Sequence, residues 1–218
     1  MMIKHYLKVA FRNLAKYKVQ SIVSILGLAV GFVCFALSTL WIRYEMTYDT
    51  FHEGAERIYL VRAHYAHEPG KISNSTPYPL ADYLQKGNPE IEAMASTSVQ
   101  KVKFRVKDTE KDVVSAAADS VLMNFFNIRV LRGTVNFLKG TNGEIAITEE
   151  FSKRIFGEEE ALGREVEVSG HASKVGAIVS GWSSHSNIPY SILTSARHYT
   201  QWGSANENLF VRIRKGTN

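Results

Sequence analysis

Residues 21–42 form one unbroken apolar run, SIVSILGLAVGFVCFALSTLWI, that contains no charged residue. A helix of this length rises about 33 Å, which is enough to cross a hydrocarbon core of about 30 Å. The run therefore predicts one transmembrane helix followed by a large water-exposed remainder. A cleaved signal peptide is the alternative, but its apolar region would span only about 7–15 residues and a small-residue cleavage site would follow it.

The charges on either side of the run predict its orientation. Five Lys or Arg residues and no acid lie in residues 1–20, whereas residues 43–57 contain two Arg residues and four acids. The positive-inside rule then places the N-terminus in the cytoplasm and residues 43–218 on the far side of the membrane.

The basic residues of the N-terminal segment recur every four positions, at Lys4, Lys8, Arg12 and Lys16. This spacing puts them on one helical face, so residues 1–20 are predicted to form a basic amphipathic helix that can lie on an anionic inner leaflet. Two interpretations stay open: an elbow helix of a larger membrane machine, or a plain topology signal.

Gly27 and Gly31 form a GxxxG motif inside the apolar run. Small residues at this spacing allow another helix to approach closely, which makes the two glycines candidates for helix packing. Glycine is also frequent in membrane helices, so the motif is equally compatible with a chance occurrence.

The sequence pI near 9.2 does not indicate a nucleic-acid partner. The net charge of +5 equals the charge of residues 1–20, and the remaining 21 Lys and Arg residues balance 21 Asp and Glu residues. The exported part is therefore neutral, and we expect no binding to nucleic acid.

The exported part is also long enough to bury a hydrophobic core. Because Cys34 is the single cysteine, this core must form without an intrachain disulfide.

Period-two patterns and turn residues predict an α+β fold, in which the transmembrane helix precedes a mixed or antiparallel sheet with short helices. The last predicted strand alternates, with Leu209, Val211 and Ile213 inward and Arg212 and Arg214 outward. Thr148 is the predicted cap of one helix and Gly157 its end. We expect helices at residues 79–86, 119–125 and 149–156, and strands at residues 58–65, 91–98, 101–107, 113–117, 128–131, 144–147, 165–168, 174–179, 188–193 and 209–215.

The clearest alternation is KVKFRVK at residues 101–107, followed by an expected hairpin turn at residues 108–111. Its apolar positions predict a half-buried strand whose other face is basic. That face has two interpretations: a surface that binds an acidic ligand or lipid headgroups, or a charged face that keeps a sheet edge from pairing. The residues of this possible interaction face are Lys101, Lys103, Arg105 and Lys107.

The sequence carries no motif for catalysis, a metal or a cofactor. The patterns GxxxxGK[ST], CxxC and HExxH are absent. His64 and His67 form HxxH without a third ligand nearby, and Ser184-His185 lacks the second glycine of a nucleophile elbow. We therefore expect a non-catalytic protein that uses no cofactor.

Four stretches carry a resemblance to a known family: LKVAFRNLAKYKVQSIVSILGLAVGF, DSVLMNFFNIRVLRG, GEIAITEEFSKRIFGEEEALGREVEV and SKVGAIVSGWSSHSNIPYSIL. The chain resembles the N-terminal part of FtsX/MacB-type ABC transporter permeases, with a MacB-like periplasmic core domain. The third stretch is the most specific, and its matching residues are Glu149, Phe156, Gly157, Gly163 and Arg164.

The resemblance implies an inner-membrane permease subunit that partners a cytoplasmic ABC ATPase, as a homodimer or paired permease. Its expected parts are a cytoplasmic basic elbow helix at residues 1–20, a transmembrane helix at residues 21–42 and a periplasmic core domain at residues 43–218. The family's exported domain transmits ATP-driven movement to periplasmic substrates or partner proteins.

The chain departs from the family in one respect. Members of the family have four or more spans, whereas this sequence ends before a second one. We therefore expect either a fragment of a longer permease or a truncated relative. The alternative function is a single-span anchored periplasmic binding or scaffold module that acts without ATP.

Overall fold

The computed structural model of the chain describes residues 2–66, 69–182 and 185–217, without the side chains of residues 2–4, 7, 10 and 11. His67, Ser183, Ser184 and the side chain of Lys4, all named above, lie outside this description. The chain divides into two compact units, Met1–Tyr48 and Asp49–Asn218, and each is described by itself.

The first unit consists of two helices, α1 (Met2–Lys16) and α2 (Lys18–Glu45), separated by Tyr17 with non-helical φ and ψ of −107° and 57°. In α2 the mean hydropathy reaches 2.3 over an 18-residue window, so this helix is long and apolar enough to cross a membrane. It extends three residues beyond the predicted run at each end. Gly27 and Gly31 lie on it with open space beside both Cα atoms, as an approaching helix requires.

The first sheet of the exported unit is built around β13 (Ala205–Ile213). Strands β1 (Ile58–Leu60) and β4 (Ser75–Pro77) pair with successive parts of one edge of β13, and β5 (Ile91–Thr97) pairs with the other edge, all antiparallel. Leu209 and Val211 on β13 and Met94 on β5 face helix α3 (Pro79–Gly87), where they form a small core with Leu80 and Leu84. A short hairpin, β2 (Ala63–His64) and β3 (Ile72–Ser73), stands beside this sheet.

The second sheet closes on itself, so we call its six closing strands the ring. Its order is β10-β6-β7-β12-β9-β11, with β10 also paired to β11 and with β8 attached outside β11. The β9–β11 and β7–β12 pairs are parallel and the others antiparallel. The strands are β6 (Val99–Val106), β7 (Thr109–Ala118), β8 (Val130–Gly133), β9 (Glu144–Thr148), β10 (Glu165–Val168), β11 (His171–Val179) and β12 (Ile192–Ser195).

A cluster of buried apolar residues fills most of the interior of the ring. Phe104 of β6 meets Phe151 of α5 (Glu149–Phe156) edge to face at 5.0 Å, and both are 1% exposed. Ile147, Ile178 and Ile192 complete the layer around them. Complete burial of large side chains at near-crystalline density makes such a cluster rigid.

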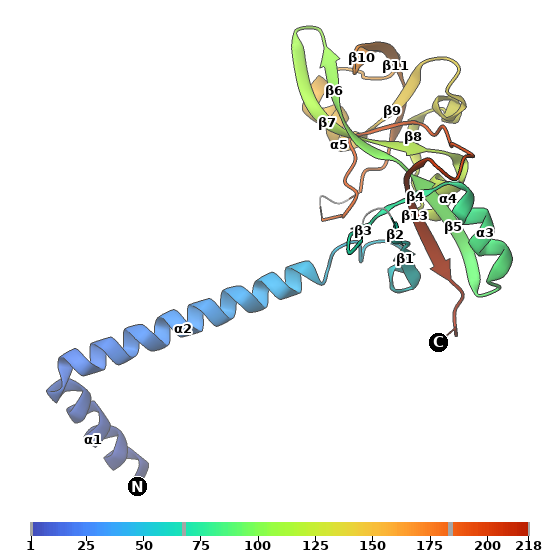
Figure 1. Cartoon of the computed structure of the whole chain (residues 1–218). Helices are drawn as coiled ribbons and strands as arrows, with labels where there is room; N and C mark the ends of the chain where they lie inside the picture. The colour runs from blue at the N-terminus through green and yellow to red at the C-terminus, as the bar shows by residue number, and fades with distance from the viewer. Residues whose placement is uncertain (1, 67–68, 183–184, 218) are drawn as a thin grey trace. The chain divides into compact units, whose positions relative to one another are not determined.

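A third core lies between the first sheet and the outer face of the ring. Helix α4 (Ser120–Phe125) supplies Leu122 and Phe125, and the 3₁₀ turn η2 (Val135–Lys139) supplies Phe137. The other face of β13 contributes Phe210. Figure 1 shows α4 beside β5 and β13, with the ring strands above these elements in the view.

The ring is an insertion into the first sheet. Ser98 alone separates β5 from β6, and residues 196–204 lead from β12 back to β13. The two parts of the exported unit are therefore joined at only two places along the chain, and movement between them has to bend one or both of these connections.

The structure confirms the α+β class, the mixed sheet and the predicted helices, including the caps of α5. Thr148 Oγ1 accepts a hydrogen bond from the Phe151 backbone N–H at 3.2 Å, and Gly157 ends the helix with φ of 61°. Asp119 caps α4 in the same way, by accepting from the Leu122 N–H at 2.7 Å.

Several predicted boundaries were wrong. The expected strand at residues 58–65 is broken into β1 and β2, because β1 pairs with β13 and β2 with β3. The hairpin turn is Lys107-Asp108 instead of residues 108–111, since Val106 already faces Thr109. The strands expected at residues 128–131, 188–193 and 209–215 are shifted to β8, β12 and β13.

Arg212 was predicted to point outward, but it is only partly exposed. Its guanidinium lies 4.4 Å from the centre of the Phe125 ring and donates a hydrogen bond to the Phe125 carbonyl. The alternation of β13 was correct, but both of its faces are covered within this domain, one by α3 and the other by α4.

Gly133, at the end of β8, comes very close to the backbone of β11. It has φ of 88°, and a Cβ atom at this position would lie 2.3 Å from the Gly176 carbonyl oxygen. Only glycine fits there, which explains why this residue ends the DSVLMNFFNIRVLRG stretch.

Candidate functional site

Residues 49–57 directly follow the first unit, and we call them the connecting segment. The carboxylate of Asp49 accepts hydrogen bonds from the Ser186 hydroxyl, from the Asn187 backbone N–H at 3.2 Å and from Asn187 Nδ2 at 2.8 Å. The Asp49 N–H donates to the His185 carbonyl at 3.2 Å. Asp49 is therefore fastened through backbone and side chain to residues 185–187, which lie 136 or more positions later in the sequence.

His52 anchors the connecting segment in an aromatic cluster. Its ring centre lies 4.8 Å from those of both Phe126 and Trp182, and Phe126 packs edge to face on Phe210 at 5.2 Å. Burial lowers the pKa of His52, and this effect outweighs the opposing charge of Asp49. The imidazole is therefore neutral near pH 7 and packs as an aromatic ring.

The far end of the segment is tied to the first sheet. Arg57 Nη1 donates to Glu92 at 2.6 Å and to the Ile213 carbonyl at 2.8 Å, so it joins the ends of β5 and β13. Glu53 accepts from Asn127, just beyond α4, at 3.2 Å. In total the segment contacts the first sheet, the end of α4 and the loop after β11.

A cavity of about 370 Å³ lies against the connecting segment. It is lined by Asp49, His52, Ala55, Ile58, Leu60, Arg62, Asn74, Phe126, Trp182, Ser186, Asn187, Ile188, Asn208 and Phe210. Its walls come from the connecting segment, from both strands of the β1–β13 pair, and from Trp182 and residues 186–188. The cavity thus occupies the place where the first sheet, α4 and the loop after β11 meet.

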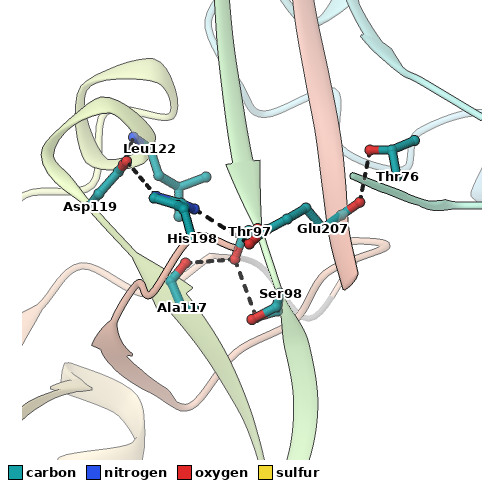
Figure 2. A network of polar contacts seen from close by, with 8 residues as sticks. All are labelled: Thr76, Thr97, Ser98, Ala117, Asp119, Leu122, His198 and Glu207. Atoms are coloured by element: carbon teal, nitrogen blue, oxygen red, sulfur yellow. Dashed lines mark hydrogen bonds and ion pairs between the residues drawn. The ribbon is translucent and has the colours of Figure 1, made fainter. Parts of the chain in front are cut away.

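The two connections between ring and first sheet meet in a second polar cluster, the junction network (Figure 2). His198, in the return connection, contacts Asp119 through Nε2 at 3.2 Å and Glu207 through Nδ1 at 3.4 Å. At the other connection, Thr97 Oγ1 donates to the Ala117 carbonyl at 2.7 Å. The imidazole also stacks on Tyr78 with ring centres 4.0 Å apart.

His198 is charged in this network. Hydrogen bonds to Asp119 and then to Glu207 raise the pKa of His198 to about 9, against the effect of partial burial. Burial acts to raise the pKa of Asp119, but hydrogen bonds from His198 and from the Leu122 N–H outweigh it, so the Asp119 pKa is lowered. An imidazolium between two carboxylates therefore holds the return connection against α4 and β13.

Two of the four residues of the predicted basic face of β6 form ion pairs within the ring. Lys103 pairs with Glu110 at 2.7 Å, and Arg105 pairs with Glu110 at 2.7 Å and with Glu167 at 3.4 Å. Lys101 and Lys107 have no ion-pair partner among the described residues. Strand β6 is not an open edge, because β7 pairs along one side of it and β10 along part of the other.

Within the described ranges, no group of three His, Cys, Asp or Glu side chains is placed to hold a metal ion. His64 lies on the two-residue strand β2 with its side chain exposed. The Asp49 contacts and the junction network were both missed by sequence reasoning. Asp119 lies at the start of the helix predicted for residues 119–125, but nothing in the local pattern links it to His198, 79 positions later.

Comparison with protein families gives a match to the MacB-like periplasmic core domain over residues 21–218. The chain thus has the fold class of the periplasmic domains of ABC-transporter-type permeases, which are non-catalytic. In this chain the domain follows a candidate transmembrane helix in the sequence. The chain belongs to the MacB-like periplasmic core domain family. Comparison with curated proteins gives no match.

Solved structures show the same fold at low identity. A domain assigned to a permease protein of Porphyromonas gingivalis is 19% identical, with a TM-score of 0.64 over 77% of this chain and 79% of that one. The extracellular domain of the noncanonic ABC-type transporter YknZ from Gram-positive bacteria is 15% identical, with a TM-score of 0.53 over 73% and 83%. The periplasmic region of MacB from Actinobacillus actinomycetemcomitans is 12% identical, with a TM-score of 0.51 over 74% and 76%.

Proposed function

We propose that this chain is an inner-membrane permease subunit of the FtsX/MacB type, or the N-terminal part of one, whose exported domain transmits ATP-driven motion of membrane helices to the periplasm. The observation that carries this proposal is the fastening of Asp49. This residue follows α2 after three intervening positions, and its carboxylate accepts three hydrogen bonds from Ser186 and Asn187. Hydrogen bonds to an ionised acceptor are about twice as strong as neutral ones.

The contacts of the connecting segment supply two routes for a displacement of the helix. One route runs through Arg57 and β1 into β13, the central strand of the first sheet. The other runs through Asp49 to residues 185–187, which follow β11 of the ring. A pull on the segment therefore acts on both parts of the exported domain at once.

The proposed topology places the N-terminus in the cytoplasm and residues 43–218 in the periplasm. The charge asymmetry around α2 supports this orientation. The basic side chains of α1 would then lie on the anionic inner leaflet. The partner we propose on that side is a cytoplasmic ABC ATPase.

Pairing with a second permease subunit, identical or related, is the proposed role of Gly27 and Gly31. Both glycines leave open space along α2. Replacing Gly31 by Leu would fill that space and should abolish pairing in the membrane, whereas Ala29→Leu on another face should not. Crosslinking through Cys34, the single cysteine, would report the difference.

The test uses the full chain, purified from its own membranes with its bound ATPase and placed in lipid nanodiscs. We expect ATP with vanadate to change hydrogen exchange in peptides that cover residues 185–192. Asp49→Ala should remove this change, because it cuts the contact with Ser186 and Asn187. Asp82→Ala, which removes an exposed acid on α3, should leave it intact.

Two results would contradict the proposal. One is an ATP-induced change that persists in full after Asp49→Ala. The other is full function when residues 21–42 are replaced by an unrelated span, which would favour the anchored scaffold module that acts without ATP.

A further inference from the structure

The cavity beside the connecting segment has the dimensions of a ligand site. Its volume of about 370 Å³ lies within the range of about 300–1,000 Å³ that is usual for sites of small organic molecules. All of its lining residues belong to the exported unit.

One side of the cavity is apolar and rigid. Trp182 and Phe126 pack edge to face at 4.9 Å, and Phe210 packs on Phe126, so the three rings hold each other in place. Ile58, Leu60 and Ile188 extend the apolar wall. This surface favours an aromatic or branched aliphatic body.

The other side carries two charged side chains, Asp49 and Arg62. Both oxygens of Asp49 accept hydrogen bonds from the neutral groups of Ser186 and Asn187, and His52 is neutral near pH 7. Arg62 has no ion-pair partner among the described residues, so it is the charged donor that can turn to an anion. The side-chain amides of Asn74 and Asn208 also line the cavity and are further hydrogen-bonding groups.

We propose that this cavity binds an amphipathic organic anion, a carboxylate with an apolar body, with the carboxylate on Arg62 and the body against Phe126, Trp182 and Phe210. A guanidinium matches a carboxylate in a bidentate pair, which fixes the orientation of the ligand. Such a ligand would bridge the connecting segment and the first sheet, but the assignment does not require coupling to ATP.

The exported unit can be tested alone as residues 47–218. Its three hydrophobic cores lie wholly within Asp49–Asn218, and the three similar solved structures are of isolated domains or regions. In a Trp202→Phe background, Trp182 is the single tryptophan of this fragment. Energy transfer from Trp182 then weights the signal toward dye bound close to the cavity.

The probe is 8-anilinonaphthalene-1-sulfonate, and N-phenyl-1-naphthylamine is the matched neutral dye without the sulfonate. We expect saturable transfer from Trp182 to the anionic dye. Arg62→Gln should weaken the anionic dye about 10- to 100-fold, which corresponds to the loss of one charged hydrogen-bonding partner, and should leave the neutral dye unchanged. Asn74→Phe, at an exposed lining position, should weaken both dyes by narrowing the cavity.

Arg197→Gln removes an exposed arginine outside the cavity and should change neither dye. The absence of saturable transfer, or equal weakening by Arg62→Gln and Arg197→Gln, would overturn the proposal. Competition experiments identify the apolar body of the ligand. Displacement of the anionic dye by 3-phenylpropionate indicates an aromatic acid, and displacement by octanoate indicates an acid with an acyl chain. Displacement by neither acid would contradict the carboxylate assignment. Near-UV circular dichroism of each variant confirms that the fold is retained.

Discussion

The ring and the first sheet belong to one domain, but the ring is a closed sheet and the first sheet is open. The ring closes on itself around a large apolar cluster, in which Phe104 and Phe151 are 1% exposed. The first sheet is open, has two short strands along one edge, and borders on the connecting segment, the cavity and the junction network. The ring is therefore suited to move as a rigid body, whereas the first sheet combines apolar packing with polar contacts at the connecting segment and at the junction network.

This difference predicts distinct responses of the two regions to mutation and pH. Apolar packing does not titrate, so a core change in the ring should lower stability equally at every pH. The junction network contains an imidazolium between two carboxylates, so its contribution should depend on pH.

The largest effect is expected for Phe151→Ala in the ring. Removing a fully buried aromatic ring should lower the free energy of unfolding by about 3–5 kcal/mol, through lost transfer energy and a residual cavity. Urea unfolding of residues 47–218 measures this loss. Val121→Ala, at a half-exposed position of α4, should change the value by less than about 0.5 kcal/mol. A loss below about 1 kcal/mol for Phe151→Ala would contradict the rigid-ring interpretation.

His198→Gln should have a smaller effect, about 1–3 kcal/mol near pH 6.5, and should remove a pH dependence. The pKa of His198 is raised from 6.5 to about 9 in the folded protein, so its stabilising contribution is complete below about pH 6.5 and is lost as the pH rises to about 9. Melting temperatures of the wild type should fall across this interval, and those of His198→Gln should fall less.

His64→Gln provides the matched control, because His64 is exposed on β2. This variant should keep the pH dependence of the wild type, as should Phe151→Ala. An unchanged pH slope in His198→Gln would show that the junction network does not act through the charge of His198.

Thr148→Ala tests the link between β9 and α5 within the ring. The substitution removes the hydrogen bond that the Phe151 N–H donates to Thr148 Oγ1 and should cost about 1 kcal/mol at all pH values. Thr148→Ser retains the cap and should recover most of the loss in the same urea titration. Equal losses in the two variants would assign the effect to the missing methyl group instead.

The smallest effect is expected for Glu110→Gln on the outer face of the ring. Glu110 pairs with Lys103 and Arg105, but all three side chains face solvent, where ion pairs contribute little. The urea midpoint should change less than for Thr148→Ala.

A separate test of the basic face of β6 is charge reversal of Lys101, Lys103 and Arg105. Binding to a partner should be unchanged if this face is merely solvated, whereas a loss of binding would favour an interaction surface.

Much of the architecture could be predicted because it depends on local chemistry. The apolar run fixed the candidate span, and alternating patterns located β6 and the core positions of β13. Turn and cap residues such as Thr148 and Gly157 marked the ends of α5. The motif stretches were sufficient to indicate the family.

The candidate site could not be predicted, since its residues are brought together from distant segments. Asp49 meets Ser186 and Asn187 across 137 or more positions, and His198 joins Asp119 to Glu207. Arg212 was assigned to the correct face of β13, but that face is covered by α4 instead of solvent, which no pattern in the strand reveals.

The sequence by itself determined the helical span, the charge asymmetry around it, most of the strands and the family, because each depends on the properties of neighbouring residues. Only the tertiary structure decided that the ring closes, that it is inserted into the first sheet, and that polar side chains converge where the two parts meet. Those features depend on which strands pair over long separations, and pairing is selected by the packing of the whole domain.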